Sequence, residues 1–206
     1  MAAITAQMVK ELREITGAGP LDSKKALEQF DGNIEKAVTF LREKGLAKAA
    51  KKLGAGRAMH EGVIESYMHF NKRLGVIVEV NCETDFVAAT EAFKNFASEL
   101  ARHIANIAPQ YVRREDVPEA VVEKERSIQM NRAIEEGKPA HIAEKVAEGR
   151  MAKFYEEICL MEQKYFRDEE KTIAQLLQET VATVGESIQI ARFARFAIGE
   201  SAADGE

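Results

Sequence analysis

The most informative run of this sequence is LGVIVEVNCETDFVAATEAFKNFASELARHIANI, residues 74–107. In its first part Val76, Val78 and Val80 recur at every second position, so they share one face of a strand. Residues 62–70 predict a partner strand across a short turn. In the last part, apolar residues follow the 3.6-residue period of a helix; they are Phe93, Phe96, Ala97, Leu100, Ile104 and Ile107. We expect this helix to cover one face of the hairpin.

The chain beyond this run predicts further strands and helices. The apolar run Ile158-Cys159-Leu160-Met161 is interpreted as a third strand. Thr172 is a candidate N-cap of a helix that ends at Gly185. The last strand is expected from Ser187 to Ile198. On it we expect one face to carry Ile188, Ile190, Phe196 and Ile198 and the other Gln189, Phe193 and Arg195.

Helical patterns also occupy the middle of the chain. A charged, weakly amphipathic stretch lies between Pro118 and Glu136, and a short helix is expected to end before Gly149. Because strands and helices do not alternate regularly, we predict an α+β fold with a small antiparallel sheet packed against helices, and not a doubly wound sheet.

The N-terminal part predicts a separate helical module. Thr5 is a candidate N-cap, Gly17 ends the first helix, and two more short helices follow within residues 1–45. Such a compact three-helix module resembles the ubiquitin-associated fold and suits a docking role. After it we expect a basic connector at 46–61, an α+β core at 62–199 and a disordered polar tail at 200–206.

Composition narrows the functional classes. The 206 residues carry a net charge of −5, which argues against a nucleic-acid binder, since such affinity comes from basic residues that displace phosphate counterions. No stretch approaches the length of a membrane span, so we expect a cytoplasmic protein that binds no membrane. The two cysteines, Cys82 and Cys159, lie in no metal-ligand spacing, and the histidines are scattered. No phosphate loop, HExxH or GxSxG motif is present.

One run within the opening stretch is unusual for a structural segment. Residues 79–88, EVNCETDFVA, pass from a strand into a turn that places Asp85 beside Phe86. In one interpretation Thr84 or Asp85 caps the following helix and Phe86 packs inward. In the other, Phe86 projects outward as a probe for a partner.

This run is similar to a signature of the elongation factor Ts family. The N-terminal segments Leu12-Arg13, Thr16-Gly17-Ala18-Gly19 and Asp22-Ser23-Lys24-Lys25-Ala26-Leu27 resemble the second family signature. Further family-like segments are Glu136-Gly137-Lys138-Pro139, Ile142-Ala143-Glu144-Lys145 and Glu148-Gly149-Arg150-Met151. The resemblance therefore covers essentially the whole chain.

The resemblance implies a guanine-nucleotide exchange factor for elongation factor Tu, with no covalent chemistry, cofactor or metal of its own. It implies that the turn of Thr84, Asp85, Phe86 and Val87 enters the nucleotide-binding domain of elongation factor Tu and dislocates its magnesium ion, so that GDP leaves and the factor stays bound until GTP arrives. It also implies that Pro20, Leu21 and Lys24 grip a neighbouring helix of the same domain. The chain resembles the short members of the family, which implies a homodimer; the last strand, with Phe193 and Arg195, is a candidate edge.

Three residues depart from the family pattern, and two other functions stay open. Pro20-Leu21 stands where two methionines are usual, which implies a stiffer grip, and Ala89 replaces a basic or amide residue. An adaptor that binds another protein through the three-helix module is the main alternative. A weaker alternative is an RNA-associated factor that uses four basic residues, Lys48, Lys51, Lys52 and Arg57.

Overall fold

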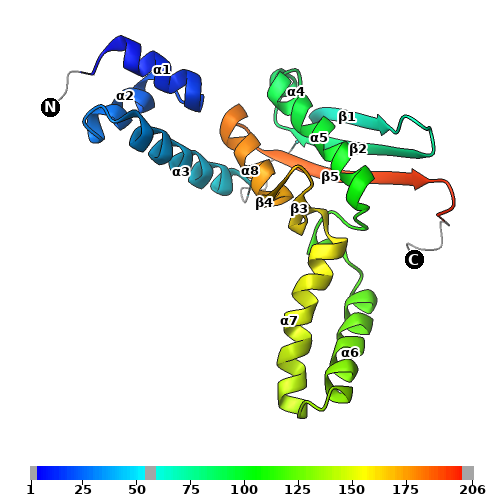
Figure 1. The fold of residues 1–206 in the computed structure, drawn as a ribbon. Coiled ribbons are helices and arrows are strands. Elements are labelled where there is room, and N and C mark those ends of the chain that lie inside the picture. The colour runs from blue at the N-terminus through cyan, green and yellow to red at the C-terminus, as the bar shows by residue number, and fades with distance from the viewer. Residues whose placement is uncertain (1–3, 54–58, 201–206) are drawn as a thin grey trace. The chain divides into compact units, whose positions relative to one another are not determined.

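The computed structural model describes residues 4–53 and 59–200, and Figure 1 shows their path. The helices are α1 (Ala6–Thr16), α2 (Pro20–Gln29), α3 (Ile34–Leu53), α4 (Asp85–Ala88), α5 (Glu91–Ile107), α6 (Glu119–Glu135), α7 (Ala140–Ile158) and α8 (Ile173–Val184). The strands are β1 (Glu61–Met68), β2 (Leu74–Cys82), β3 (Lys164–Tyr165), β4 (Asp168–Thr172) and β5 (Ile188–Ala197), and short 3-10 turns are η1 (Arg114–Asp116) and η2 (Leu160–Glu162). Parts of the expected connector (54–58, with Arg57) and tail (201–206) lie outside the described residues.

The contacts divide the chain into two compact units. The first comprises Met1–Val63, Val80–Phe96 and Leu177–Gln189, and the second comprises Ile64–Glu79, Ala97–Leu176 and Ile190–Glu206. Three strands form one sheet in the order β1-β2-β5, and β3 pairs with β4 in a second, antiparallel ribbon. The elements confirm the expected α+β class with a small antiparallel sheet.

The opening run of the sequence folds as its pattern predicts. Val76, Val78 and Val80 of β2 are buried, and α5 lies across one face of the sheet in Figure 1. The apolar stripe of α5 is buried from Phe93 to Ile104. Strand alternation turns the other positions of β2, such as Ile77, to the opposite face. Ile77 on this second face is 50% exposed, so the face is not fully covered.

In strand β5 the side that is buried changes along its length, so the predicted division of its two faces holds only for its first residues. Ile188 and Ile190 are buried, whereas Phe196 and Ile198, expected on the same face, are exposed. Phe193 is half-buried, and Arg195 donates through Nε to the carbonyl of Ala105 at 3.4 Å. The edge strand therefore turns Phe193 and Arg195 inward at its distal half and leaves the neighbouring apolar positions uncovered.

Helices α1 to α3 form the N-terminal module. Thr5 caps α1 by accepting from the amide of Met8 at 3.2 Å, and Gly17 ends this helix at φ +66°. Leu12, Leu27 and Leu41 form the centre of the module core. Helix α3 does not stop near residue 45 but continues to Leu53, because the alanines and lysines after Gly45 are good helix formers.

Two expectations for the middle of the chain are wrong. Helix α7 passes through Gly149, whose helical position is open on all sides, and ends only at Ile158. The proposed strand 158–161 is the end of α7 followed by η2, with one isolated bridge between Tyr111 and Cys159. The apolar run is buried because it packs as the end of a helix, and periodicity cannot distinguish a short buried strand from a short buried helix segment.

Two glycines should respond oppositely to alanine. At Gly62, with φ +156°, an added Cβ would lie 2.3 Å from the carbonyl oxygen of Val80, so Gly62→Ala should disrupt the pairing of β1 with β2 and lower the melting temperature. At Gly149, where nothing lies within 4 Å, Gly149→Ala should raise the free energy of unfolding by about 0.5–1 kcal/mol. Thermal and urea denaturation would measure both. Equal effects of the two substitutions would contradict this assignment.

Candidate functional site

The turn of Thr84, Asp85, Phe86 and Val87 (the 84–87 turn) connects β2 to α5 through the four-residue helix α4. Thr84 is in extended conformation and caps this helix, since its Oγ1 accepts from the amide of Val87 at 3.3 Å. Val87 is only 3% exposed and anchors the turn in the core. The capping interpretation of Thr84 is therefore confirmed.

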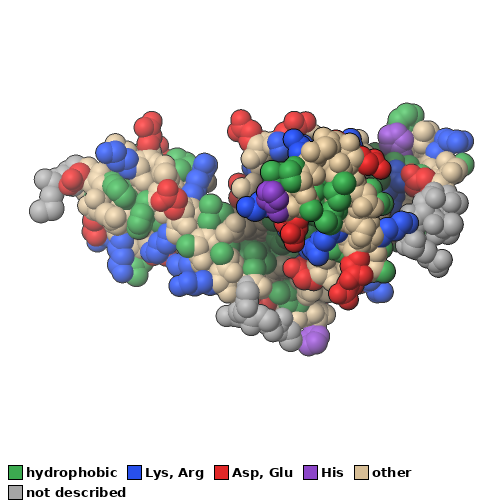
Figure 2. All heavy atoms as spheres, turned by 90° about the horizontal axis from the view of Figure 1, so that it is seen from below, with side chains coloured by type: hydrophobic (Ala, Val, Ile, Leu, Met, Phe, Trp, Pro, Cys, Tyr) green, Lys and Arg blue, Asp and Glu red, His purple; other side chains and the backbone are tan. Residues whose placement is uncertain are grey.

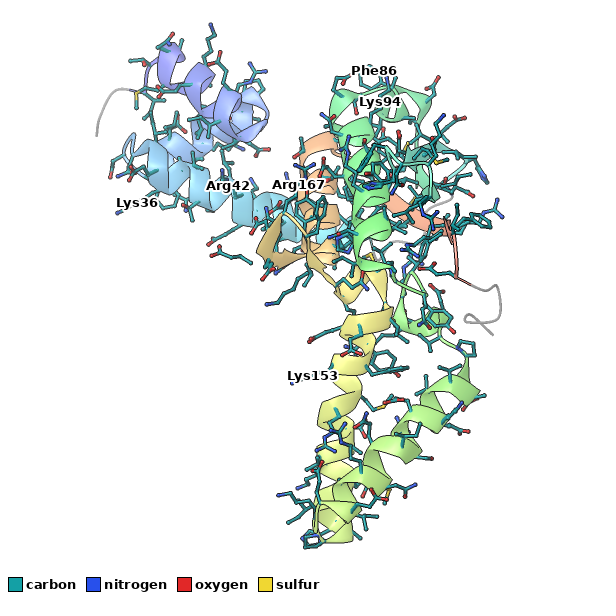
Figure 3. The ribbon with its side chains drawn as sticks, turned by 45° about the vertical axis from the view of Figure 1, so that its right-hand side comes forward. Lys36, Arg42, Phe86, Lys94, Lys153 and Arg167 are labelled. Carbon is teal, nitrogen blue, oxygen red and sulfur yellow. The ribbon has the colours of Figure 1, made fainter. Side chains whose placement is uncertain are left out.

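Phe86 does not pack inward. It is 77% exposed, although a phenyl ring gains about 1.5–3 kcal/mol when it is buried. Asp85 beside it is also exposed. Figure 3 shows Phe86 and Lys94 at the same end of the ribbon, on α4 and on the first turn of α5. The turn thus presents an acid and an aromatic ring to solvent on a backbone that the core holds.

The backbone before α4 is held by two further contacts. Cys82 is buried, and its thiol donates to the carbonyl of Thr84 at 3.1 Å. Burial raises the pKa of this thiol, which keeps the proton that it donates. On the other side, the amide and hydroxyl of Thr84 donate to the carboxylate of Glu186 at 3.1 and 2.9 Å. No local sequence pattern marks Glu186, because it lies 102 residues from Thr84 along the chain.

The second predicted site lies at the start of α2. Gly19 is the N-cap and Pro20 occupies the first helical turn, where a missing amide proton has no cost. Leu21 is 66% exposed, and Lys24 is exposed in an i,i+4 pair with Glu28 at 3.7 Å. The three predicted residues Pro20, Leu21 and Lys24 thus share one exposed helix start.

This helix start is fixed to α3 by a charge pair. Asp22 accepts from the ammonium of Lys44 at 2.9 Å, and Lys48 lies 3.6 Å from its other oxygen. The hydrogen bond from Lys44, assisted by the charge of Lys48, holds the pKa of Asp22 below its usual range. The pairing orients the exposed tip of the module.

The basic residues proposed for RNA binding are partly used inside the protein. Figure 2 shows Lys and Arg side chains over the N-terminal module, interspersed with other residue types. Lys48 pairs with Asp22, and Lys52 donates through Nζ to the carbonyl of Gly185. Two of the four residues of that candidate patch therefore have partners within the protein. This weakens the argument that the four residues bind RNA.

Two classes of site do not occur in the described part of the chain. Across residues 4–53 and 59–200, no group of three or more His, Cys, Asp or Glu side chains is placed to hold a metal ion. Over the same residues, no helix is both long enough and apolar enough to cross a membrane.

A family model described as Elongation factor TS matches residues 2–200 of the chain. The chain belongs to the elongation factor Ts family. It is 56% identical over 203 residues to the elongation factor Ts of Carboxydothermus hydrogenoformans, covering 98% of this chain and 93% of the relative. It is 52% identical over 197 residues to that of Thermosipho melanesiensis, covering 96% and 100%, and 54% identical over 198 residues to that of Geobacter sulfurreducens, covering 96% and 91%.

Membership of the elongation factor Ts family makes this chain a translation elongation factor. Six of the seven predicted contact residues are exposed: Thr84, Asp85 and Phe86 in the 84–87 turn, and Pro20, Leu21 and Lys24 at the start of α2. The seventh, Val87, is buried. Protein biosynthesis is therefore the process in which this protein takes part.

The two neighbours in α4 should differ in their effect on stability. Phe86→Ala removes an exposed ring and should change the free energy of unfolding by less than about 0.5 kcal/mol. Val87→Ala removes buried methyl groups and should lower it by roughly 1–3 kcal/mol. Urea denaturation followed by circular dichroism would compare them. A large loss for Phe86→Ala would show that this ring is part of the core.

Proposed function

We propose that this protein is a guanine-nucleotide exchange factor that binds GDP-bound elongation factor Tu and promotes GDP release without covalent chemistry. The observation that carries the proposal is the outward-facing Phe86, held on a capped and anchored turn, in a member of the elongation factor Ts family. An exposed ring with little to gain from its own fold suits insertion into a partner. We place this activity in the cytoplasm, with translation.

In the proposed mechanism Phe86 enters between two helices of the nucleotide-binding domain of elongation factor Tu, and Asp85 perturbs the groups that hold the magnesium ion. Magnesium requires near-ideal octahedral geometry and bridges phosphates in P-loop proteins. A small shift of its supporting ligands therefore weakens the binding of both ion and GDP. The rigidity of the 84–87 turn matters because a flexible turn would change its own conformation and leave the magnesium site of elongation factor Tu undisturbed.

Thermodynamic linkage sets the size of the effect. A factor that binds nucleotide-free elongation factor Tu more tightly than the GDP-bound form lowers GDP affinity by the same ratio. A thousandfold loss of GDP affinity corresponds to roughly 4 kcal/mol of differential binding. Buried aromatic residues at the centre of an interface contribute on that scale. The factor then remains bound until GTP binds.

The second proposed contact is the N-terminal module. Pro20, Leu21 and Lys24 would grip a neighbouring helix of the same domain of elongation factor Tu. Support comes from the exposure of Leu21 and from the Asp22–Lys44 pair, which orders this helix start before binding. Pro20 and Leu21 stand where the family pattern usually has two flexible methionines. This contact should therefore adapt less well to sequence changes on the surface of elongation factor Tu.

GDP release tests the proposal directly. Substoichiometric protein should accelerate the release of fluorescent GDP from elongation factor Tu in a stopped-flow experiment. Phe86→Ala should slow the accelerated release roughly thirtyfold, because a central aromatic contact is worth about 2 kcal/mol or more. Phe70→Ala is the matched control, since Phe70 is also an exposed phenylalanine, 87% accessible, in the β1–β2 turn. An unchanged rate for Phe86→Ala would remove the insertion role.

We also propose that two copies of the chain associate through the uncovered face of the sheet. This open face is formed by five exposed apolar residues, Ile64, Met68, Ile77, Phe196 and Ile198. A hollow of about 390 Å³ is lined by four of these residues, Met68, Ile77, Phe196 and Ile198, together with residues of the β1–β2 turn. A second copy is the occupant that we favour. In a symmetric dimer, a single interface would cover the open face of each chain.

The association state should depend on the open face. In multi-angle light scattering the protein should have about twice the chain mass of 22.9 kDa, and Ile77→Lys should reduce it to the monomer. Ile128→Lys, which changes a similarly exposed isoleucine on α6, should leave the dimer intact. A monomer for the unmodified protein at tens of micromolar would exclude the dimer without touching the exchange proposal.

A further inference from the structure

Two turns that are far apart in the sequence hold one another in the first compact unit. The amide of Thr84 donates to Oε2 of Glu186 at 3.1 Å, and its hydroxyl lies 2.9 Å from Oε1 and 3.1 Å from Oε2. In the opposite direction, the amide of Ser187 donates to Oε1 of Glu83 at 2.9 Å. The turn between β2 and α4 and the turn between α8 and β5 are therefore joined by carboxylates from both sides.

The contact with Glu186 also decides where the Thr84 hydroxyl points. A hydroxyl has one proton, and the carboxylate of Glu186 accepts it. The lone pairs of Oγ1 are then available to the amide of Val87, 3.3 Å away, which is the cap of α4. Without an acceptor beside it, the hydroxyl could rotate and the cap would lose its fixed orientation.

The α8–β5 turn that carries Glu186 is itself fixed on its other side. The hydroxyl of Ser187, a buried residue, donates to the carbonyl of Lys52 at 3.1 Å, and Lys52 donates through Nζ to the carbonyl of Gly185. Lys52 lies in the last turn of α3, the long helix of the N-terminal module. Glu186 thus projects from a braced turn, which is what a positioning group requires.

We propose that Glu186 is a positioning residue that fixes the 84–87 turn for nucleotide exchange. It acts through Thr84, and it needs no contact with elongation factor Tu to do so. The inference rests on the proposed exchange function for its consequence in GDP release, while the fixing of the turn is a property of the free protein. A misplacement of about 1 Å at a group that acts by insertion is enough to lower its effect strongly.

The test combines three variants with two measurements. Glu186→Ala removes the acceptor, Thr84→Val removes the hydroxyl at nearly constant shape, and Thr84→Ser keeps the hydroxyl. Glu186→Ala should lower the maximal rate of GDP release, at saturating factor, about tenfold, with a smaller change in the half-saturating concentration. Thr84→Ser should retain a faster GDP release than Thr84→Val, because it keeps the hydroxyl that Glu186 orients. Glu123→Ala, which removes an exposed carboxylate from α6, is the matched control for charge.

The second measurement needs no partner. The Val87 amide should exchange its proton with solvent about tenfold faster in Glu186→Ala, and the double variant with Thr84→Val should be no worse than Thr84→Val alone. Losses that multiply in the double variant, or an unchanged Val87 amide, would overturn the positioning role. If the unmodified protein failed to accelerate GDP release from elongation factor Tu, the exchange proposal would be wrong. The exchange rate of the Val87 amide would still decide whether Glu186 fixes the turn.

Discussion

The burial of Val87 constrains the whole of the candidate site. In a helix, neighbouring side chains point about 100° apart, so a core contact made by Val87 turns Phe86 away from that core. Helix α4 has four residues, too few to be stable without its surroundings. Its conformation depends on the Val87 contact and on the Thr84 cap. The exposed ring is therefore a consequence of how the turn is anchored, and not of a loose loop.

Much of this arrangement follows from the sequence, for identifiable reasons. The alternation of Val76, Val78 and Val80 and the long helical stripe that begins at Phe93 each extend over several residues, so only one regular structure satisfies them. Thr172 also behaves as predicted, since its Oγ1 accepts from the amide of Gln175 at 3.2 Å and caps α8. Local hydrogen-bonding residues at element starts are well predicted because their partners are close in the chain.

The wrong or missing predictions concern short runs and contacts between residues that are far apart in the chain. The run from Ile158 to Met161 is too short for its period to be recognised, and its burial arises from the packing of Cys159 and its neighbours against distant residues. Gly149 was expected to end a helix, yet a single glycine costs only about 1 kcal/mol and the pairing of α6 with α7 outweighs it. The sequence leaves the orientation of Phe86 open because the four residues of α4 cover barely one helical turn, too short for a repeating apolar pattern. Glu186 was missed since nothing local marks a carboxylate whose partner lies a hundred positions earlier.

The two proposed contact surfaces should contribute differently to exchange. Only binding energy that differs between the nucleotide-free and GDP-bound forms of elongation factor Tu promotes release, whereas energy common to both forms increases affinity alone. A contact of Leu21 with the outside of a helix would be similar in both forms, so the N-terminal module would mainly raise affinity. Insertion of Phe86 requires the partner to open, which links its burial, worth up to about 3 kcal/mol, to the form without GDP. Since a thousandfold effect requires roughly 4 kcal/mol, the ring supplies most of it only if its turn does not relax on contact. The contacts of Thr84 and Val87 oppose that relaxation, which is why a small capped helix suits this role better than a flexible loop.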